Sequence, residues 1–119
     1  MLLKIQGGAD VTSGTFEDSR FIGVGGILGT YFRSDAGIGN LAPALSRRGY
    51  LIICSSNYAA GASVRSLVTH LVTDNDGASI AFVSNLSTLN GQTATFAVTA
   101  GYITVSGLSS GNNQCSVYY

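Results

Sequence analysis

Charge is scarce in this chain, and its scarcity excludes several classes of protein. Charged residues make up 10% of the sequence, against about 25% in an average soluble domain. The six basic residues are matched by six acidic ones, so we expect no basic patch of the kind that binds nucleic acid. Two cysteines and one histidine are too few for a zinc module or a disulfide scaffold. The composition therefore predicts no metal ion, no cofactor and no nucleic-acid partner.

Long apolar runs are also missing. The longest continuous run, residues 50–54, falls well short of the ~20 residues that are needed to span a bilayer. The first six residues are too few to supply the apolar region and the cleavage site of a signal peptide. These features predict synthesis in the cytoplasm and no membrane insertion.

Small polar residues are what the sequence has in abundance. Gly, Ser, Thr and Asn fill 48 of the 119 positions, and they must form most of a surface that carries so little charge. Two explanations stay open at this point. Either part of this surface is buried against identical copies, or a hydroxyl-rich face binds sugars or other polar ligands.

Alternation of apolar and polar residues with a period of two dominates the chain and predicts β-strands. The clearest case is residues 93–99, where Ala94, Phe96 and Val98 fall on one face and threonines on the other. Further strands are expected at residues 20–26, 27–33, 64–73, 79–86, 102–106 and 114–119. Residues 50–54 are nearly all apolar, which favours a central strand that is covered on both faces.

Turn residues divide these strands at short intervals. Residues 74–77 are expected to form a hairpin tip, Asn90-Gly91 a type I′ hairpin, and Ala100-Gly101 a close connection between two strands. Residues 34–48 have the only helical character, which Pro43 limits to one or two turns. The pattern predicts one domain over residues 1–119, an all-β antiparallel two-sheet sandwich of seven to nine strands, similar to a jelly roll.

Catalytic motifs are weak throughout the sequence. Gly37-Ile38-Gly39-Asn40-Leu41-Ala42 matches a dinucleotide fingerprint formally, but Pro43 spoils the helix that must follow, so a turn is expected there. His70 lies among apolar neighbours and is expected to be a structural strand residue, because no nucleophile and carboxylate are placed to form a triad with it. Cys54 and Cys115 are expected to be buried free thiols, since no export signal precedes them. We expect no enzyme activity.

Candidate ligand-binding residues are suggested by position alone. Several tyrosines stand at strand ends, where a flat ring with a polar tip serves a packed rim, an interface or sugar recognition. Asp74 and Asp76 are expected in a hairpin tip, with a weak ion site shared between chains as the alternative. The candidates at strand ends and in loops are Tyr31, Arg33, Asp35, Asn57 and Tyr58, with Asp74 and Asp76 added to them.

The second half of the chain resembles the C-terminal β-sandwich modules of bacteriophage tail fibres and tailspikes. The resemblance covers residues 48–119 and lies in the order and composition of the strands; it includes no ligand motif. It is carried by Arg48-Gly49-Tyr50-Leu51-Ile52-Ile53, a loop rich in Ser, Asn and Gly, Val68-Thr69-His70-Leu71-Val72, Ile80-Ala81-Phe82-Val83-Ser84, Thr93-Ala94-Thr95-Phe96-Ala97-Val98, Tyr102-Ile103-Thr104-Val105 and the last strand, Cys115-Ser116-Val117-Tyr118-Tyr119.

This resemblance implies a homotrimeric module of the virion tail that binds a host cell-surface polysaccharide or other receptor, or that stabilises the trimer. It carries over no catalytic residue. Two alternatives stay open: a capsid or tail decoration subunit that binds no glycan, and a glycan-processing enzyme such as a hydrolase or an esterase.

Overall fold

The computed structural model describes residues 20–22, 28–34, 37–57, 64–108 and 112–119, and these form nine strands without a helix. All strand pairs are antiparallel, and the strands divide between two sheets, which confirms the predicted all-β, two-sheet class. The strands are β1 (Arg20–Ile22), β2 (Leu28–Ser34), β3 (Gly39–Pro43), β4 (Gly49–Asn57), β5 (Val64–Thr73), β6 (Ile80–Leu89), β7 (Thr95–Thr99), β8 (Tyr102–Ser106) and β9 (Asn113–Tyr118).

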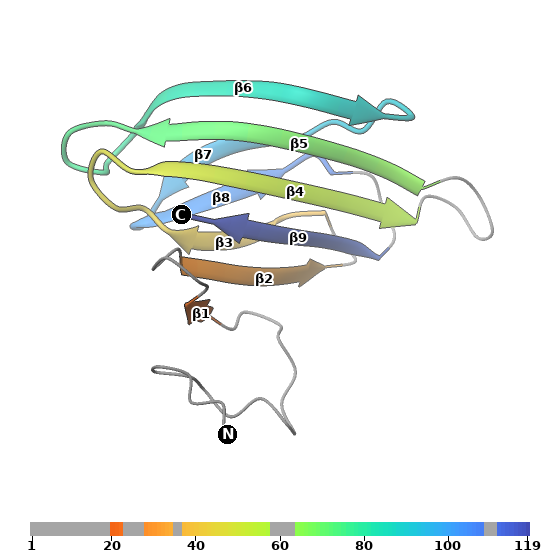
Figure 1. Cartoon of the computed structure of the whole chain (residues 1–119), viewed down its shortest axis with the longest axis horizontal. Coiled ribbons are helices and arrows are strands. Elements are labelled where there is room, and N and C mark those ends of the chain that lie inside the picture. Colours follow the sequence, from red (N-terminus) through yellow and green to blue (C-terminus); the bar gives the residue numbers. More distant parts are fainter. Residues whose placement is uncertain (1–19, 23–27, 35–36, 58–63, 109–111) are drawn as a thin grey trace.

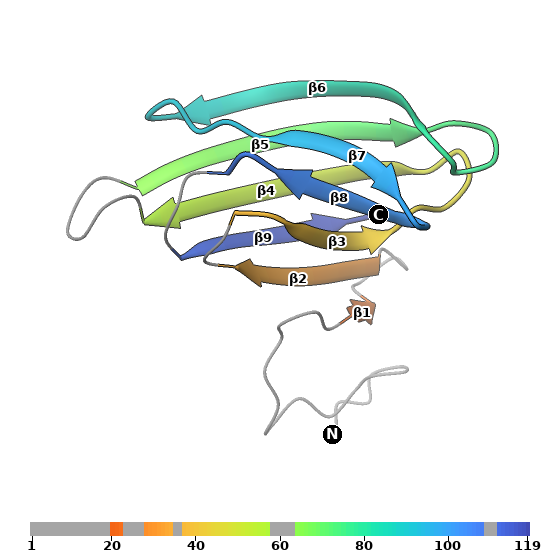
Figure 2. The ribbon, with the colours of Figure 1, turned by 180° about the vertical axis from the view of Figure 1, so that it is seen from behind.

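The larger sheet has six strands in the order β1-β2-β9-β4-β5-β6, and the smaller has three in the order β3-β8-β7. Figure 1 looks onto the large sheet, with the small sheet behind it, and Figure 2 shows the reverse view. β4, β5 and β6 follow one another as a meander, as the turn signals predict. β9, the last strand in chain order, is inserted between β2 and β4.

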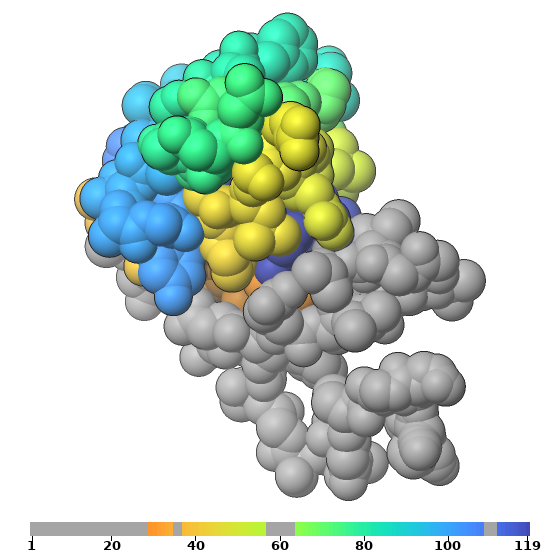
Figure 3. Space-filling model, turned by 90° about the vertical axis from the view of Figure 1, so that its left-hand side faces the viewer, coloured from red at the N-terminus to blue at the C-terminus, as the bar shows by residue number. Residues whose placement is uncertain are grey.

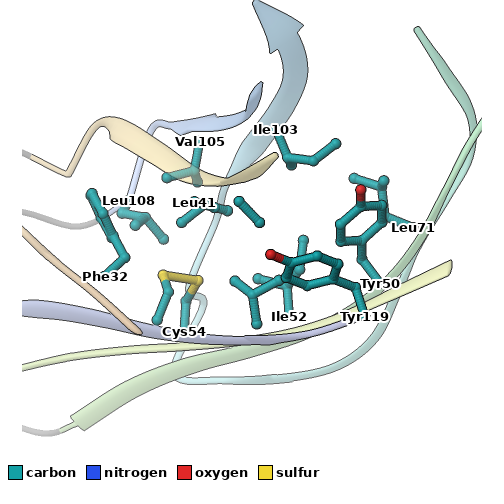
Figure 4. Close-up of a cluster of buried hydrophobic side chains, with 13 residues drawn as sticks. Phe32, Leu41, Tyr50, Ile52, Cys54, Leu71, Ile103, Val105, Leu108 and Tyr119 are labelled. Atoms are coloured by element: carbon teal, nitrogen blue, oxygen red, sulfur yellow. A yellow bond between two sulfur atoms is a disulfide. The ribbon is translucent and has the colours of Figure 1, made fainter. Parts of the chain in front are cut away.

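The core lies between the two sheets and is built largely from alternate residues of β4, β8 and β9, with further side chains from β2, β3 and β5 (Figure 4). In β4 the buried side chains are Tyr50, Ile52 and Cys54, in agreement with the period of two that defines one face of a strand. The other members of the core cluster are Phe32, Leu41, Ala42, Leu71, Ile103, Val105, Leu108, Cys115, Val117 and Tyr119.

Cys54 and Cys115 face each other across β4 and β9, and a disulfide joins them in the centre of this core. The prediction of two free thiols is therefore wrong. It relied on the absence of an export signal, whereas the register of β4 on β9 makes the two residues direct neighbours, with Cα atoms 4.0 Å apart. Sequence spacing alone did not reveal this register.

Two other local predictions are corrected, and a third is confirmed. Within residues 37–48 the expected helical turn is instead a strand, β3, whose edge position tolerates Pro43. Asn90 and Gly91 do have the positive φ angles of a tight turn, at 53° and 72°, but β6 and β7 belong to different sheets, so this turn is no hairpin. Ala100 and Gly101 do close a two-residue hairpin, in which Thr99 pairs with Tyr102.

The fourth correction concerns the central strand β4. The small sheet covers only one side of it, and on the other side Leu51 is 39% exposed and Ile53 37% exposed. The apolar run at residues 50–54 is thus a strand with one buried face and one open face, although its composition is typical of a strand buried on both.

Candidate functional site

The seven candidate binding residues do not come together. Tyr31 and Arg33 lie on β2, on the side of the large sheet that faces away from the small sheet, where Tyr31 pairs with Ser116 and Arg33 with Gln114. Asn57 ends β4 at the same end of the molecule. Asp35 and Tyr58 lie outside the described residues.

Asp74 and Asp76 lie at the opposite end, in the connection between β5 and β6. The ten residues of β5 separate the two ends by about 30 Å, at about 3.3 Å per residue. Figure 3 shows this end, with the β5–β6 turn beside residues 43–50 and the β7–β8 hairpin. The candidates would therefore belong to two separate sites.

Both carboxylates are engaged within their own turn. Asp74 accepts hydrogen bonds from the Ser79 hydroxyl and, at 3.4 Å, from the Asp76 backbone N–H, and Asp76 accepts one from the Ala78 N–H at 2.9 Å. The Ser79 hydrogen bond, assisted by the bonds from Asp76, lowers the pKa of Asp74 below its usual 3.8. These contacts are what a hairpin tip requires. Among the described residues, no three His, Cys, Asp or Glu side chains cluster in a way that would hold a metal ion.

A second polar cluster fixes the same end of the sandwich around Tyr50. The Tyr50 hydroxyl accepts a hydrogen bond from the Leu45 N–H at 2.8 Å and donates one to the Pro43 carbonyl at 2.6 Å. Its ring stacks on Tyr119 with centroids 5.0 Å apart, and burial raises its pKa above the usual 10.0. The Thr73 hydroxyl donates to the Leu45 carbonyl as well. This cluster positions the β3–β4 connection.

At the other end, three buried polar side chains lie between the sheets. The side-chain amide of Gln92 donates to the Ser56 hydroxyl at 2.9 Å. Asn113 is fully buried, and neither its amide nitrogen nor its carbonyl oxygen has a hydrogen-bond partner. An unsatisfied buried amide is costly, so Asn113 is a weak point of the core. The sequence gives no signal for this cluster, because Asn113 sits in a stretch of turn-like residues.

The two glycines of the formal dinucleotide motif have structural roles. Gly37 has a φ of +72°, and a Cβ there would lie 2.6 Å from the Leu108 carbonyl oxygen. A Cβ on Gly39 would lie 2.4 Å from the Phe32 ring. Close packing therefore accounts for both glycines. The part of the chain that the structure describes contains no helix able to cross a membrane.

One extended feature of the described surface is the side of the large sheet that faces away from the small sheet over β9, β4, β5 and β6, which we call the outer face. On β9, β4, β5 and β6 it consists of the residues that alternate with the buried ones. Its exposed apolar side chains include Leu51, Ile53, Phe82 and Tyr118. His70 is exposed on this face as well, edge-on to the Phe82 ring with centroids 5.4 Å apart.

A shallow hollow of about 370 Å³ opens in this face. It is lined by Gly49, Tyr50, Leu51, His70, Tyr118 and Tyr119. A Cβ added at Gly49 would meet no atom within 4 Å. The lining of the hollow is almost entirely apolar.

Comparison with protein-family models, with curated proteins and with solved structures found no match.

One feature of the sequence that bears on the outer face is the absence of charged residues from its C-terminal part. Asp76 is the last charged residue, so the 43 residues from Gly77 to Tyr119 carry no Lys, Arg, Asp or Glu. These residues form β6, β7, β8 and β9, which belong to both sheets.

Proposed function

We propose that this chain is a non-enzymatic module of a bacteriophage tail fibre or tailspike, which forms a homotrimer in the virion tail and binds a host cell-surface polysaccharide. The jelly-roll-like form of the sandwich belongs to the same proposal. It rests on the resemblance of residues 48–119 to such modules and on the two-sheet antiparallel fold.

One observation carries the proposal: the four strands β6–β9 hold no charged side chain, although they reach the surface in both sheets. A lone domain of this size needs surface charge to stay dispersed in water. Assembly with identical copies removes part of this surface from water, and the remaining hydroxyl and amide groups suit the hydroxyl groups of sugars.

The trimer is tested by light scattering coupled to size-exclusion chromatography at micromolar concentration. The expected mass is three times the 12.2 kDa of one chain. A stable single chain under these conditions would contradict the proposal.

Polysaccharide binding is tested on an array of bacterial surface glycans. Tyr31→Ala and Arg33→Ala are expected to weaken binding without changing the mass of the assembly, since both residues face outward from β2, Tyr31 at its middle and Arg33 near its end, outside the four strands of the outer face. Tyr102→Ala, which removes an exposed tyrosine from the small sheet, is the matched control and is expected to bind normally. An array without any binding, together with tight binding to assembled virus particles, would favour the decoration subunit instead.

A further inference from the structure

We infer that the outer face of the large sheet is the surface on which a second copy of this chain docks. The inference rests on the proposed function, because it names the interface through which the proposed assembly forms. It is argued from the chemistry of the face, its size and its charge.

The register of the four strands fixes what the face contains. Tyr118, Leu51 and His70 form one row across β9, β4 and β5, and Ser116, Ile53 and Val68 form the next. Phe82 on β6 is 49% exposed and lies opposite Val72. These rows place an apolar centre within a rim of serines and Gln114, which is the arrangement of a protein interface with a dry centre and a polar rim.

No outward position of the described parts of β9, β4, β5 and β6 holds Lys, Arg, Asp or Glu. A charged face repels its own copy, because like charges then meet across the interface, whereas a neutral face does not. The net charge of the whole chain is zero, which removes long-range repulsion between copies as well. These conditions favour an identical partner over a basic or acidic one.

The size of the face is sufficient. The four strands form a surface about 19 Å wide at about 4.8 Å per strand, about 20 Å long at β9 and about 30 Å long at the nine- and ten-residue strands β4, β5 and β6. Its projection is about 550 Å², and side chains raise the accessible area toward the ~800 Å² that each partner buries in a stable complex. The hollow above Gly49 receives a protruding side chain of the neighbouring copy.

The decisive variant is Leu51→Lys, which puts a charge at the centre of the face. Because Leu51 is already 39% exposed, the lysine reaches water in the isolated chain and leaves the fold intact, which circular dichroism verifies. The expected mass then falls to that of one chain. Ile38→Lys is the matched control. Ile38 is 59% exposed and lies between β2 and β3, outside this face, so the mass of the assembly formed by this variant is expected to equal that of the wild type.

A second measurement tests whether the outer face is covered in the assembly, without placing a charge on it. Both cysteines of the chain are paired, so one introduced cysteine is the only free thiol. Ser84 lies on the outer face opposite His70. The thiol introduced by Ser84→Cys is expected to react with maleimide at least tenfold more slowly in the assembly than in single chains obtained by dilution. Ala97→Cys, exposed on the small sheet, is expected to react equally fast in both states.

The outcomes separate this inference from the proposed function. If Leu51→Lys still forms a trimer and Ser84→Cys stays reactive, the trimer stands and this interface is wrong. If the wild-type chain forms a dimer that Leu51→Lys abolishes, the interface stands and the trimer is wrong. A third outcome would overturn both the interface and the trimer: the wild-type chain remains a monomer, and the Ser84→Cys thiol is protected from maleimide only when a glycan is added.

Discussion

Reduction of the Cys54–Cys115 disulfide is expected to remove a large part of the stability of the fold. The two residues are 61 positions apart in the sequence, so their bond closes a long loop in the unfolded chain. For a loop of this length the chain-entropy relation gives about 4 kcal/mol at 25 °C. Most domains have only about 5–15 kcal/mol in total, so the reduced protein is expected to be marginally stable.

The measurement is urea unfolding followed by circular dichroism, with and without dithiothreitol, at one fixed protein concentration. With a slope of about 2 kcal/mol per molar urea, the midpoint is expected to fall by about 2 M on reduction. The double variant Cys54→Ala with Cys115→Ala is the control. Its urea midpoint is expected to lie near that of the reduced wild type and to be the same with and without dithiothreitol.

Two results would refute this reasoning. One is an equal urea midpoint for the oxidised and reduced wild type. The other is a count of two free thiols in the wild-type chain unfolded without reductant, because the bond would then be absent from the protein itself.

Three further predictions concern single side chains. Tyr50→Phe removes the hydroxyl that the Leu45 N–H donates to, and it is expected to lower the free energy of unfolding by about 1–3 kcal/mol in urea titrations. Asn113→Leu replaces an unpartnered buried amide by an apolar side chain of similar size and is expected to raise the thermal midpoint, whereas a lower midpoint would show that the amide is satisfied. Asp74 has a lowered pKa in the folded chain, so its ionised form adds stability above pH 3.8, and this stability is lost as the pH falls through the folded value. Asp74→Asn is therefore expected to have a lower free energy of unfolding than the wild type at pH 7. In acid unfolding curves near pH 2 the two free energies are expected to converge. They would not converge if the Ser79 hydrogen bond did not favour the carboxylate.

Alternation along the chain was sufficient to predict the fold class, because strands such as β4, β8 and β9 bury one of their two faces. Residues 93–99 illustrate this well: the half-buried side chains of β7 include Phe96 and Val98, as their period of two predicts. The position of β9 was not predictable in the same way. Its pairing with β2 and β4 depends on contacts between distant segments, and the Cys54–Cys115 disulfide follows from that pairing.

The candidate site was less predictable than the fold. Polar candidates such as Arg33 and Asp74 look alike in sequence, but strand direction places them at opposite ends of the sandwich. The outer face was missed because Leu51 and Ile53 read as the second buried face of a central strand. Only the number of strands in each sheet decides whether a second layer covers them, and that number is set by tertiary packing.

The placement of β9 has a consequence for how the chain folds as it is made. Residues 113–118 leave the ribosome after all the other strands, yet they supply the backbone partners of both β2 and β4. Until they emerge, the large sheet exists as two separate pieces, and Cys54 has no thiol to join. Completion of the sheet and oxidation of the chain are therefore both postponed until translation of this last strand.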